Sequence, residues 1–317
     1  MSNKSNNQGR AFEFACIYAL AAEISKFREV RIETNGSYNA AESAWNAIEE
    51  SLKNTLSVAA LSATTTIFDL EPLILEDGKD ELTLKIQSDQ EGIIGDVRDI
   101  LIIRRGIHWE IGLSVKHNHM AVKHSRLSGK LDFGEKWYGI KCSDDYWNRV
   151  KPIFEYLKRE RKKGTKWDDI PNKWDVTYVP ILKAFMDEIA RGTKLDPSTP
   201  RKMVEYLLGR FDFYKVISLD QDEITQIQAF NMRGTLNKRG INHKPKKEIP
   251  ITCLPTRIVH MGFVPERKNI VEIYMDEGWQ FSFRIHSAST IVESSLKFDV
   301  QIVGMPTTII SINCHWN

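Results

Sequence analysis

Residues 96–126 read DVRDILIIRRGIHWEIGLSVKHNHMAVKHSR, and the two apolar runs inside this stretch predict the centre of the fold. The runs at 99–103 and 109–115 are rich in isoleucine, leucine and valine, which is typical of strands. The five residues 104–108 separate them and include a glycine. We therefore expect a β-hairpin.

This hairpin is predicted to bring three polar side chains together. Pairing about the turn places Asp99 opposite residues 113–114. Directly paired residues have Cβ atoms about 5 Å apart, and residues two apart on a strand share a face. Asp99, Ser114 and Lys116 can therefore converge without any contact between distant parts of the chain.

A carboxylate and a lysine on neighbouring strands suit metal-assisted hydrolysis of a phosphodiester. Mg²⁺ polarises the phosphate, lowers the pKa of an attacking water, and takes oxygen ligands that commonly include one or two carboxylates. Asp99 is the best candidate to anchor the metal, and Lys116 could orient the water or stabilise the developing charge. The same spacing also fits a hairpin with an acid at its mouth and a lysine reaching solvent, so both interpretations stay open.

Longer motifs resemble a known nuclease family. Asp99 with Ser114-Val115-Lys116 resembles the D…(D/E)xK signature of the restriction-endonuclease-like superfamily, with serine in place of the usual acid. Residues 9–14, GRAFEF, are similar to the first-helix motif of that superfamily. The whole chain resembles the HaeIII-type type II restriction endonucleases, most specifically in KHNH at 116–119, KHSRLS at 123–128 and FRIHSA at 283–288.

The resemblance implies an activity and a fold. It implies Mg²⁺-dependent cleavage of double-stranded DNA at GGCC, between the central G and C, with blunt ends. It also implies an α/β fold whose restriction-endonuclease-like core has a mixed β-sheet flanked by helices. A palindromic site suits a homodimer. A restriction system further implies a bacterial cytoplasm and a cognate DNA methyltransferase, without direct contact between the two enzymes.

Ser114 raises the question of which acid completes the metal site. A hydroxyl is a poor Mg²⁺ ligand beside a carboxylate, so a second acid is expected. The candidates are Glu13 and Asp96. The resemblance favours Glu13, because a helical glutamate joins the metal site in the superfamily.

Several further residues are candidates for contacts with DNA. Beside the hairpin these are His117, Asn118, His119, Lys123, His124 and Arg126. Such side chains hold phosphates or donate to guanine acceptors, although a solvated polar turn would have the same composition. His117 and His119 alone are too few for a zinc site, and three consecutive letters do not make an HNH nuclease.

Two later segments carry similar groups. Residues 231–247 hold six bases and no acid, and Arg233, Asn237, Lys238 and Arg239 suit hydrogen bonds to base edges, although charged loops are often only solvated. In the alternating segment 279–286, the aromatic stripe is expected in the core. The polar stripe with Arg284 and His286 could face DNA.

The composition fits a globular protein and sets limits on its class. The chain has 317 residues, of which 42% are hydrophobic and 27% charged. It has no apolar run of membrane-spanning length, and its polar N-terminus lacks the apolar region of a signal peptide. The four cysteines are scattered without CxxC spacing, which favours reduced thiols in a cytoplasmic protein.

Periodicity predicts helices first and strands later. Helices are expected at 10–29, 39–62, 144–163, 179–191 and 199–209, and strands at 82–87, 211–218, 224–230, 257–264, 270–275, 279–286 and 298–303. We expect a nuclease core at 1–165. A helical connector and a β-rich DNA-recognition part would follow at 166–317, with a soft boundary.

Two other functions compete with the nuclease. A non-catalytic, sequence-specific DNA-binding protein on the same fold is supported by Ser114 and opposed by Asp99, Lys116 and Glu13. A DNA methyltransferase is disfavoured, because the chain has neither a glycine-rich cofactor loop after a first strand nor a Pro-Cys nucleophile. An ATP-binding GxxxxGK[ST] loop is also missing.

Overall fold

The computed structural model describes residues 2–76, 78, 80–88, 95–240, 242–245 and 247–316, with the side chains of 2–5 and of His124 outside the description. The chain forms two compact units. The first unit comprises Met1–Met120, Gly209–Cys253 and Thr307–Asn317, and the second comprises Ala121–Leu208 and Leu254–Pro306. The domain boundary expected near residue 165 stays a prediction. The two compact units have different boundaries from the expected parts.

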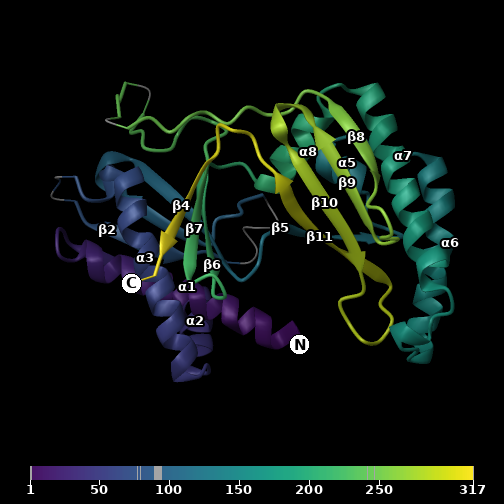
Figure 1. Cartoon of the computed structure of the whole chain (residues 1–317), viewed down its shortest axis with the longest axis horizontal. Helices are drawn as coiled ribbons and strands as arrows, with labels where there is room; N and C mark the ends of the chain where they lie inside the picture. The colour runs from purple at the N-terminus through teal and green to yellow at the C-terminus, as the bar shows by residue number, and fades with distance from the viewer. Residues whose placement is uncertain are drawn as a thin grey trace. The chain divides into compact units, whose positions relative to one another are not determined.

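The first unit is built on a mixed sheet (Figure 1). Its strand order is β1-β2-β3-β4-β6-β7-β12, and only the β1–β2 and β4–β6 pairs are parallel. The strands are β1 (Val30–Glu33), β2 (Leu82–Ile86), β3 (Ile100–Arg104), β4 (Trp109–His117), β6 (Phe213–Leu219), β7 (Ile224–Phe230) and β12 (Ile310–His315). The expected α/β class, with a mixed sheet and helices, is confirmed.

The helices of the first unit cover this sheet with apolar faces. They are α1 (Ser2–Ile24), α2 (Gly36–Asn46) and α3 (Glu50–Leu70), followed by the 3₁₀ turn η1 (Pro72–Ile74). α1 contacts β4, and α3 contacts β6 and β7. Phe12, Ile17, Leu56 and Ile67 join the buried strand residues in one apolar core. This burial is the main stabilising term for the unit.

The prediction of one helix at 39–62 is wrong in one respect, because the structure has two helices there. α2 ends at Asn46 and α3 begins at Glu50, with Glu49 in an extended conformation between them. Both α2 and α3 contact α1. Asn35 begins α2 by accepting hydrogen bonds from the N–H groups of Ser37 and Tyr38.

The second unit has an antiparallel sheet of order β5-β11-β10-β9-β8. Its strands are β5 (Ala121–Ser128), β8 (Ile258–Phe263), β9 (Ile270–Met275), β10 (Gln280–His286) and β11 (Ser295–Gly304). Its helices are α5 (Phe133–Tyr138), α6 (Asp144–Lys163), α7 (Val179–Leu195) and α8 (Thr199–Leu208). Phe283 and Phe298 of the sheet meet Phe185 of α7 with ring centroids 5.6 and 5.0 Å apart, so the aromatic stripe lies in the core as expected.

Shorter turns complete the described chain. They are η2 (Arg105–Ile107), η3 (Trp167–Asp169), the π-turn η4 (Trp174–Tyr178) and η5 (Asp276–Gly278). η2 is the turn of the β3–β4 hairpin and ends at His108 with φ 51°. In the described part of the chain, no helix combines the length and the apolar character needed to cross a membrane.

α6 shows why one helix could be predicted to the residue. Ser143 accepts a hydrogen bond from the N–H of Tyr146, which caps the helix start. Gly164 ends the helix in the left-handed conformation with φ 73°, where glycine has no steric penalty. The first turn is acidic and the last turn basic, which complements the helix dipole.

Candidate active site

The β3–β4 hairpin builds the centre of the candidate site. Ile100 pairs with Leu113, and the N–H of Asp99 donates to the carbonyl of Leu113 at 2.7 Å. This register places Asp99 beside Ser114, as the hairpin argument predicts. Asp99 therefore stands at the mouth of the hairpin, directly before β3.

One oxygen of Asp99 collects three donors from β4. Its Oδ2 accepts hydrogen bonds from the Lys116 ammonium at 2.8 Å, the Val115 N–H at 2.7 Å and the Ser114 hydroxyl at 3.3 Å. The side chains of Lys116 and Asp99 are 27% and 25% exposed. The pair is thus held rigidly by the strand backbone and is still accessible to a substrate.

α1 carries Glu13 toward the same end of β4. Phe12 is fully buried, and its ring centroid lies 6.3 Å from that of His117, at the end of β4. One turn after Glu13, the buried thiol of Cys16 has its pKa raised by burial and then by the charges of Glu13 and Asp99. The charges of both carboxylates therefore reach the same buried thiol.

A buried lysine that the sequence reasoning missed lies next to this group. Lys215 of β6 is in register with Ser114 in the parallel β4–β6 pair, and it is 2% exposed. Its ammonium donates to the carbonyl of Met120 at 2.7 Å. Burial, and then the nearby charge of Lys116, lower the pKa of Lys215 to about 7, while Asp99 acts in the opposite direction. A lysine in the middle of the apolar strand FYKVISL was the signal available in the sequence.

Asp96 has a different partner. Its carboxylate forms a two-point ion pair with Arg98, with Nε–Oδ1 and Nη2–Oδ2 distances of 2.8 Å each. Both residues are buried, and Arg98 also reaches Glu110 at 2.9 Å. The Arg98 guanidinium lowers the pKa of Asp96 against the opposing effect of burial, which is the largest single influence. A carboxylate neutralised in this way is a weaker candidate for a metal ligand than Glu13.

The histidine segment at the end of β4 is tied to the loop after β6. His117 Nε2 lies 2.7 Å from Asp220 Oδ2, and the Asn118 side chain accepts from the Asp220 N–H at 2.9 Å. Asn118 has φ 49°, a left-handed conformation that asparagine tolerates. These contacts fix the segment beside Lys116. His119 also makes contacts within the structure.

The basic residues of β5 belong to the second unit. The Lys123 ammonium donates to the Tyr206 carbonyl at 2.9 Å and lies 3.9 Å from the centroid of the Tyr206 ring. Burial lowers the pKa of Lys123 to about 8. Arg126 binds Glu293 and the Ser295 hydroxyl at 3.3 and 2.8 Å. The side chain of His124 lies outside the described residues.

The 231–247 loop shows two kinds of residue. Asn237 is 2% exposed, and its amide donates to the Lys247 carbonyl at 2.7 Å, so it holds the loop together. Arg233 and Arg239 are exposed, and the Arg233 guanidinium donates to the Arg210 carbonyl at 2.5 Å. Lys238 is partly exposed. Arg239 is exposed, as are Lys244 and Lys247 of the same loop.

The polar stripe of β10 is partly used inside the second unit. Arg284 pairs with Asp299 of β11 at 2.9 Å, and its side chain is 51% exposed. His286 Nδ1 lies 2.8 Å from the carbonyl of Ser287. Arg284 therefore keeps surface for a partner while it is anchored by the buried Asp299.

The donor set near Asp99 fits Mg²⁺ better than a metal enclosed by protein. Among the residues that the structure describes, no group of three or more histidine, cysteine, aspartate or glutamate side chains is placed to hold a metal. Mg²⁺ does not need such a group, because it keeps several waters and uses one or two carboxylates together with substrate phosphates. Asp99 and Glu13 would supply these carboxylates.

Comparison with known proteins adds an independent finding. A family model described as HaeIII restriction endonuclease matches residues 9–306. The chain belongs to this family. The Type II restriction enzyme HaeIII of Haemophilus aegyptius is 51% identical over 317 residues, with 100% of this chain and 99% of that enzyme covered. No solved structure matches the chain.

Membership in the HaeIII restriction endonuclease family makes the chain a site-specific deoxyribonuclease. The recognition from KHNH, KHSRLS and FRIHSA is therefore confirmed at the level of the family. At 51% identity the chain is a relative of HaeIII and not HaeIII itself.

Proposed function

We propose that this protein is a type II restriction endonuclease that cuts double-stranded DNA at GGCC, between the central G and C, and leaves blunt ends in a reaction that requires Mg²⁺. The observation that carries the proposal is the Asp99–Lys116 pair, 2.8 Å apart at the mouth of the β3–β4 hairpin. It stands in a chain that matches HaeIII along its whole length. GGCC is the site implied by the resemblance to HaeIII-type enzymes.

The chemistry follows from the positions of these groups. Bound Mg²⁺ would polarise the scissile phosphate and make a water more acidic. Asp99 and Glu13 would hold the ion through their carboxylate oxygens. The Val115 N–H keeps Asp99 Oδ2 in one orientation, and the Lys116 ammonium stands beside it. Lys116 can therefore orient the attacking water or stabilise negative charge that develops on the phosphate.

The proposal includes the partners that such an enzyme requires. Its substrate is double-stranded DNA, and a palindromic site would be met by a homodimer, because two-fold related subunits present the same groups to both strands. The host would be a bacterium whose cytoplasm also contains a methyltransferase that protects the same site. The exposed Arg239 and the half-exposed Arg284 are among the candidates on this chain for contacts with DNA.

A second function is favoured by one observation. Ser114 stands where the D…(D/E)xK signature has an acid, and the neighbouring strand places the buried Lys215 beside it. A site with fewer carboxylates and an added cation would bind a divalent ion more weakly. A non-catalytic DNA-binding protein on the same fold would have these features.

Digestion of a plasmid with mapped GGCC sites separates the two functions. Wild type and Lys116→Ala would each be incubated with the plasmid in Mg²⁺ or in EDTA. Discrete blunt fragments from wild type in Mg²⁺ alone would support the nuclease and its site. Tight binding to GGCC duplexes without cleavage in Mg²⁺ would support the binding protein.

A further inference from the structure

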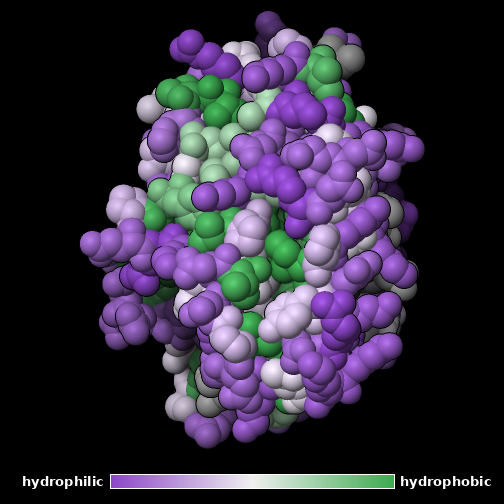
Figure 2. Space-filling model, turned by 90° about the vertical axis from the view of Figure 1, so that its right-hand side faces the viewer, coloured by the Kyte–Doolittle hydropathy of each residue, from purple (hydrophilic) through white to green (hydrophobic). Residues whose placement is uncertain are grey.

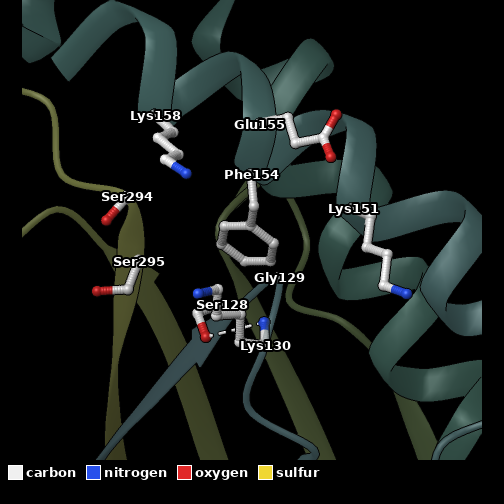
Figure 3. Close-up of a pocket in the computed structure, with 9 residues that line it drawn as sticks. All are labelled: Ser128, Gly129, Lys130, Lys151, Phe154, Glu155, Lys158, Ser294 and Ser295. Carbon is white, nitrogen blue, oxygen red and sulfur yellow. Dashed lines mark hydrogen bonds between the residues drawn. The ribbon is translucent and has the colours of Figure 1, made fainter. Parts of the chain in front are cut away.

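The second unit contains a cavity that none of the candidate site residues lines. Its volume is about 630 Å³. It lies between α6, the end of β5 and the start of β11 (Figure 3). The polar lining comes from Glu155, three lysines and three serines, the last two groups being Lys130, Lys151, Lys158, Ser128, Ser294 and Ser295. We call this cavity the lysine–serine pocket.

The lysines of this pocket outnumber its acids. Glu155 is the one carboxylate among the lining residues, against three ammonium groups. Among the described ion pairs, none involves Lys130, Lys151 or Lys158. Lys163 on the same helix is paired with Glu160 at 2.6 Å. The pocket therefore presents net positive charge that the fold does not neutralise by contact.

The serine hydroxyl oxygens of the pocket accept hydrogen bonds. Ser128 Oγ accepts from the backbone N–H groups of Lys130 and Leu131 at 3.3 and 3.1 Å. Ser294 Oγ accepts from Arg161 at 3.3 Å, and Ser295 Oγ accepts from Arg126 at 2.8 Å. A hydroxyl oxygen that accepts in this way still has its own proton to give. The described contacts thus leave three O–H donors beside three ammonium groups.

The floor of the pocket is rigid. Phe154 is 3% exposed, and a Cβ at Gly129 would lie 3.3 Å from the Phe154 Cβ, so helix and loop meet closely here. Figure 3 shows the Phe154 ring between Lys158 and Lys151, with the Lys158 ammonium directed toward the ring. The face that carries α6 and α7 is mostly hydrophilic, with apolar groups in its middle and in its upper part (Figure 2).

We propose that the lysine–serine pocket binds the phosphodiester backbone of duplex DNA, in addition to the Asp99–Lys116 site; this rests on the proposed function. Lysine ammonium groups and serine hydroxyls are the usual partners of DNA phosphates. Lys151 and Lys158 are seven residues apart on α6, which spreads their charges over about 10 Å along the helix. Phosphates of one DNA strand follow each other about every 3.4 Å along the duplex axis, so this spread suits a polyanion better than a single phosphate.

The salt dependence of DNA binding tests the proposal directly. Affinity would be measured in EDTA, over a range of salt concentrations, for a GGCC duplex and for a duplex of equal length without GGCC. The Lys151→Gln/Lys158→Gln variant should flatten the plot of log affinity against log salt by about two units, since each phosphate contact contributes about 0.9. Both duplexes should lose affinity by the same factor, because backbone contacts carry no sequence information.

Lys163→Gln is the matched control. It removes the same charge from the same helix, but Lys163 lies five residues after Lys158 and therefore points about 140° away around the helix. Its salt slope should equal that of wild type. The Lys151→Arg/Lys158→Arg variant should restore the slope, because it keeps both charges.

The remaining outcomes are also decisive. If the folded double glutamine variant has the same salt slope as wild type, and wild type binds and cuts DNA, then the pocket does not contact DNA. The proposed function would be unaffected by that result. A second result would also overturn the proposal. Inorganic phosphate would raise the melting temperature of wild type but not of the double glutamine variant, while the salt slopes of DNA binding would be the same for both proteins. The pocket would then bind a free anion and not DNA. Wild type that binds no DNA would instead refute the proposed function.

Discussion

Lys215 lies in register with Ser114 on the neighbouring parallel strand, and only 2% of Lys215 is exposed. The row Asp99–Ser114–Lys215 crosses three adjacent strands of the first sheet. Where the D…(D/E)xK signature has a second acid, this chain therefore has a hydroxyl between a carboxylate and a buried ammonium. Lys215 also holds the carbonyl of Met120, just after the end of β4.

Replacing Lys215 with methionine should slow cleavage by about ten- to a hundredfold while DNA binding changes little. Methionine fills the buried site, but it has no amine to donate to the Met120 carbonyl, close to Asp99. Single-turnover cleavage and thermal unfolding would be measured together. Full activity in a folded Lys215→Met protein would show that this lysine serves packing alone.

Removing the Ser114 hydroxyl should have a small effect. Ser114 Oγ makes the longest of the three hydrogen bonds to Asp99 Oδ2, at 3.3 Å, and the other two donors remain in Ser114→Ala. We expect cleavage within about tenfold of wild type, because this hydrogen bond is long and the two shorter ones still hold the carboxylate. A loss as complete as that of an Asp99 variant would assign Ser114 a direct role at the metal or the phosphate.

Asp99→Asn and Lys116→Ala should each reduce cleavage by at least about a hundredfold. Asparagine keeps the shape of Asp99 but not the charge that would hold Mg²⁺, and alanine removes the ammonium 2.8 Å from that carboxylate. Binding to a GGCC duplex in EDTA should stay near that of wild type. Cleavage by either purified variant at a rate near that of wild type would contradict the site assignment.

Arg239→Gln should weaken discrimination between GGCC and other sequences. Arg239 is exposed, and a guanidinium suits two hydrogen bonds to guanine. Arg233 is the comparison within the same loop, because its guanidinium already donates to the Arg210 carbonyl. Competition binding with matched and mismatched duplexes measures the effect. An equal loss of affinity on all duplexes would make Arg239 a phosphate contact.

Glu71 predicts a pH dependence of stability. It is fully buried, and burial raises its pKa to about 8, although hydrogen bonds from Tyr214 at 2.8 Å and from the Asn237 N–H at 2.6 Å act in the opposite direction. Between about pH 4.5 and 8 the folded state binds a proton that the unfolded state has lost. The stability contributed by this group is therefore present below that window and is lost as pH rises through it.

The isosteric variant Glu71→Gln isolates this effect. Glutamine keeps an oxygen for Tyr214 and Asn237 and cannot ionise, so it should gain stability relative to wild type, by a few kcal/mol, between pH 5 and 8. Denaturant unfolding at several pH values measures the difference. A constant difference across the range would mean that Glu71 is already ionised in the folded protein.

The sequence alone was sufficient for the parts of the protein that depend on neighbouring residues. The hairpin that joins Asp99 to Lys116 depends on a turn only a few residues long, so its register follows from local geometry. The 144–163 helix was predictable because Ser143 and Gly164 mark its two ends. The polar and aromatic faces of 280–286 followed from strand alternation.

Only the tertiary structure decided the contacts between distant segments. β4 and β6 are parallel, and parallel neighbours need a crossover; here the chain passes through the second unit before it returns at Gly209. No local pattern could therefore place Lys215 beside Ser114. Strand β12, near the end of the chain, likewise joins the sheet by pairing with β7.

The same physical reason separates the predictable site residues from the others. Asp99 and Lys116 lie close together because a short turn joins their strands, whereas the partner of a buried polar group depends on contacts between distant segments. Lys215 donates a hydrogen bond to the Met120 carbonyl, and Glu71 accepts one from Tyr214. The sequence determined which groups were available for chemistry on DNA, and long-range packing decided which of them became partners, because burial penalises every charge left without one.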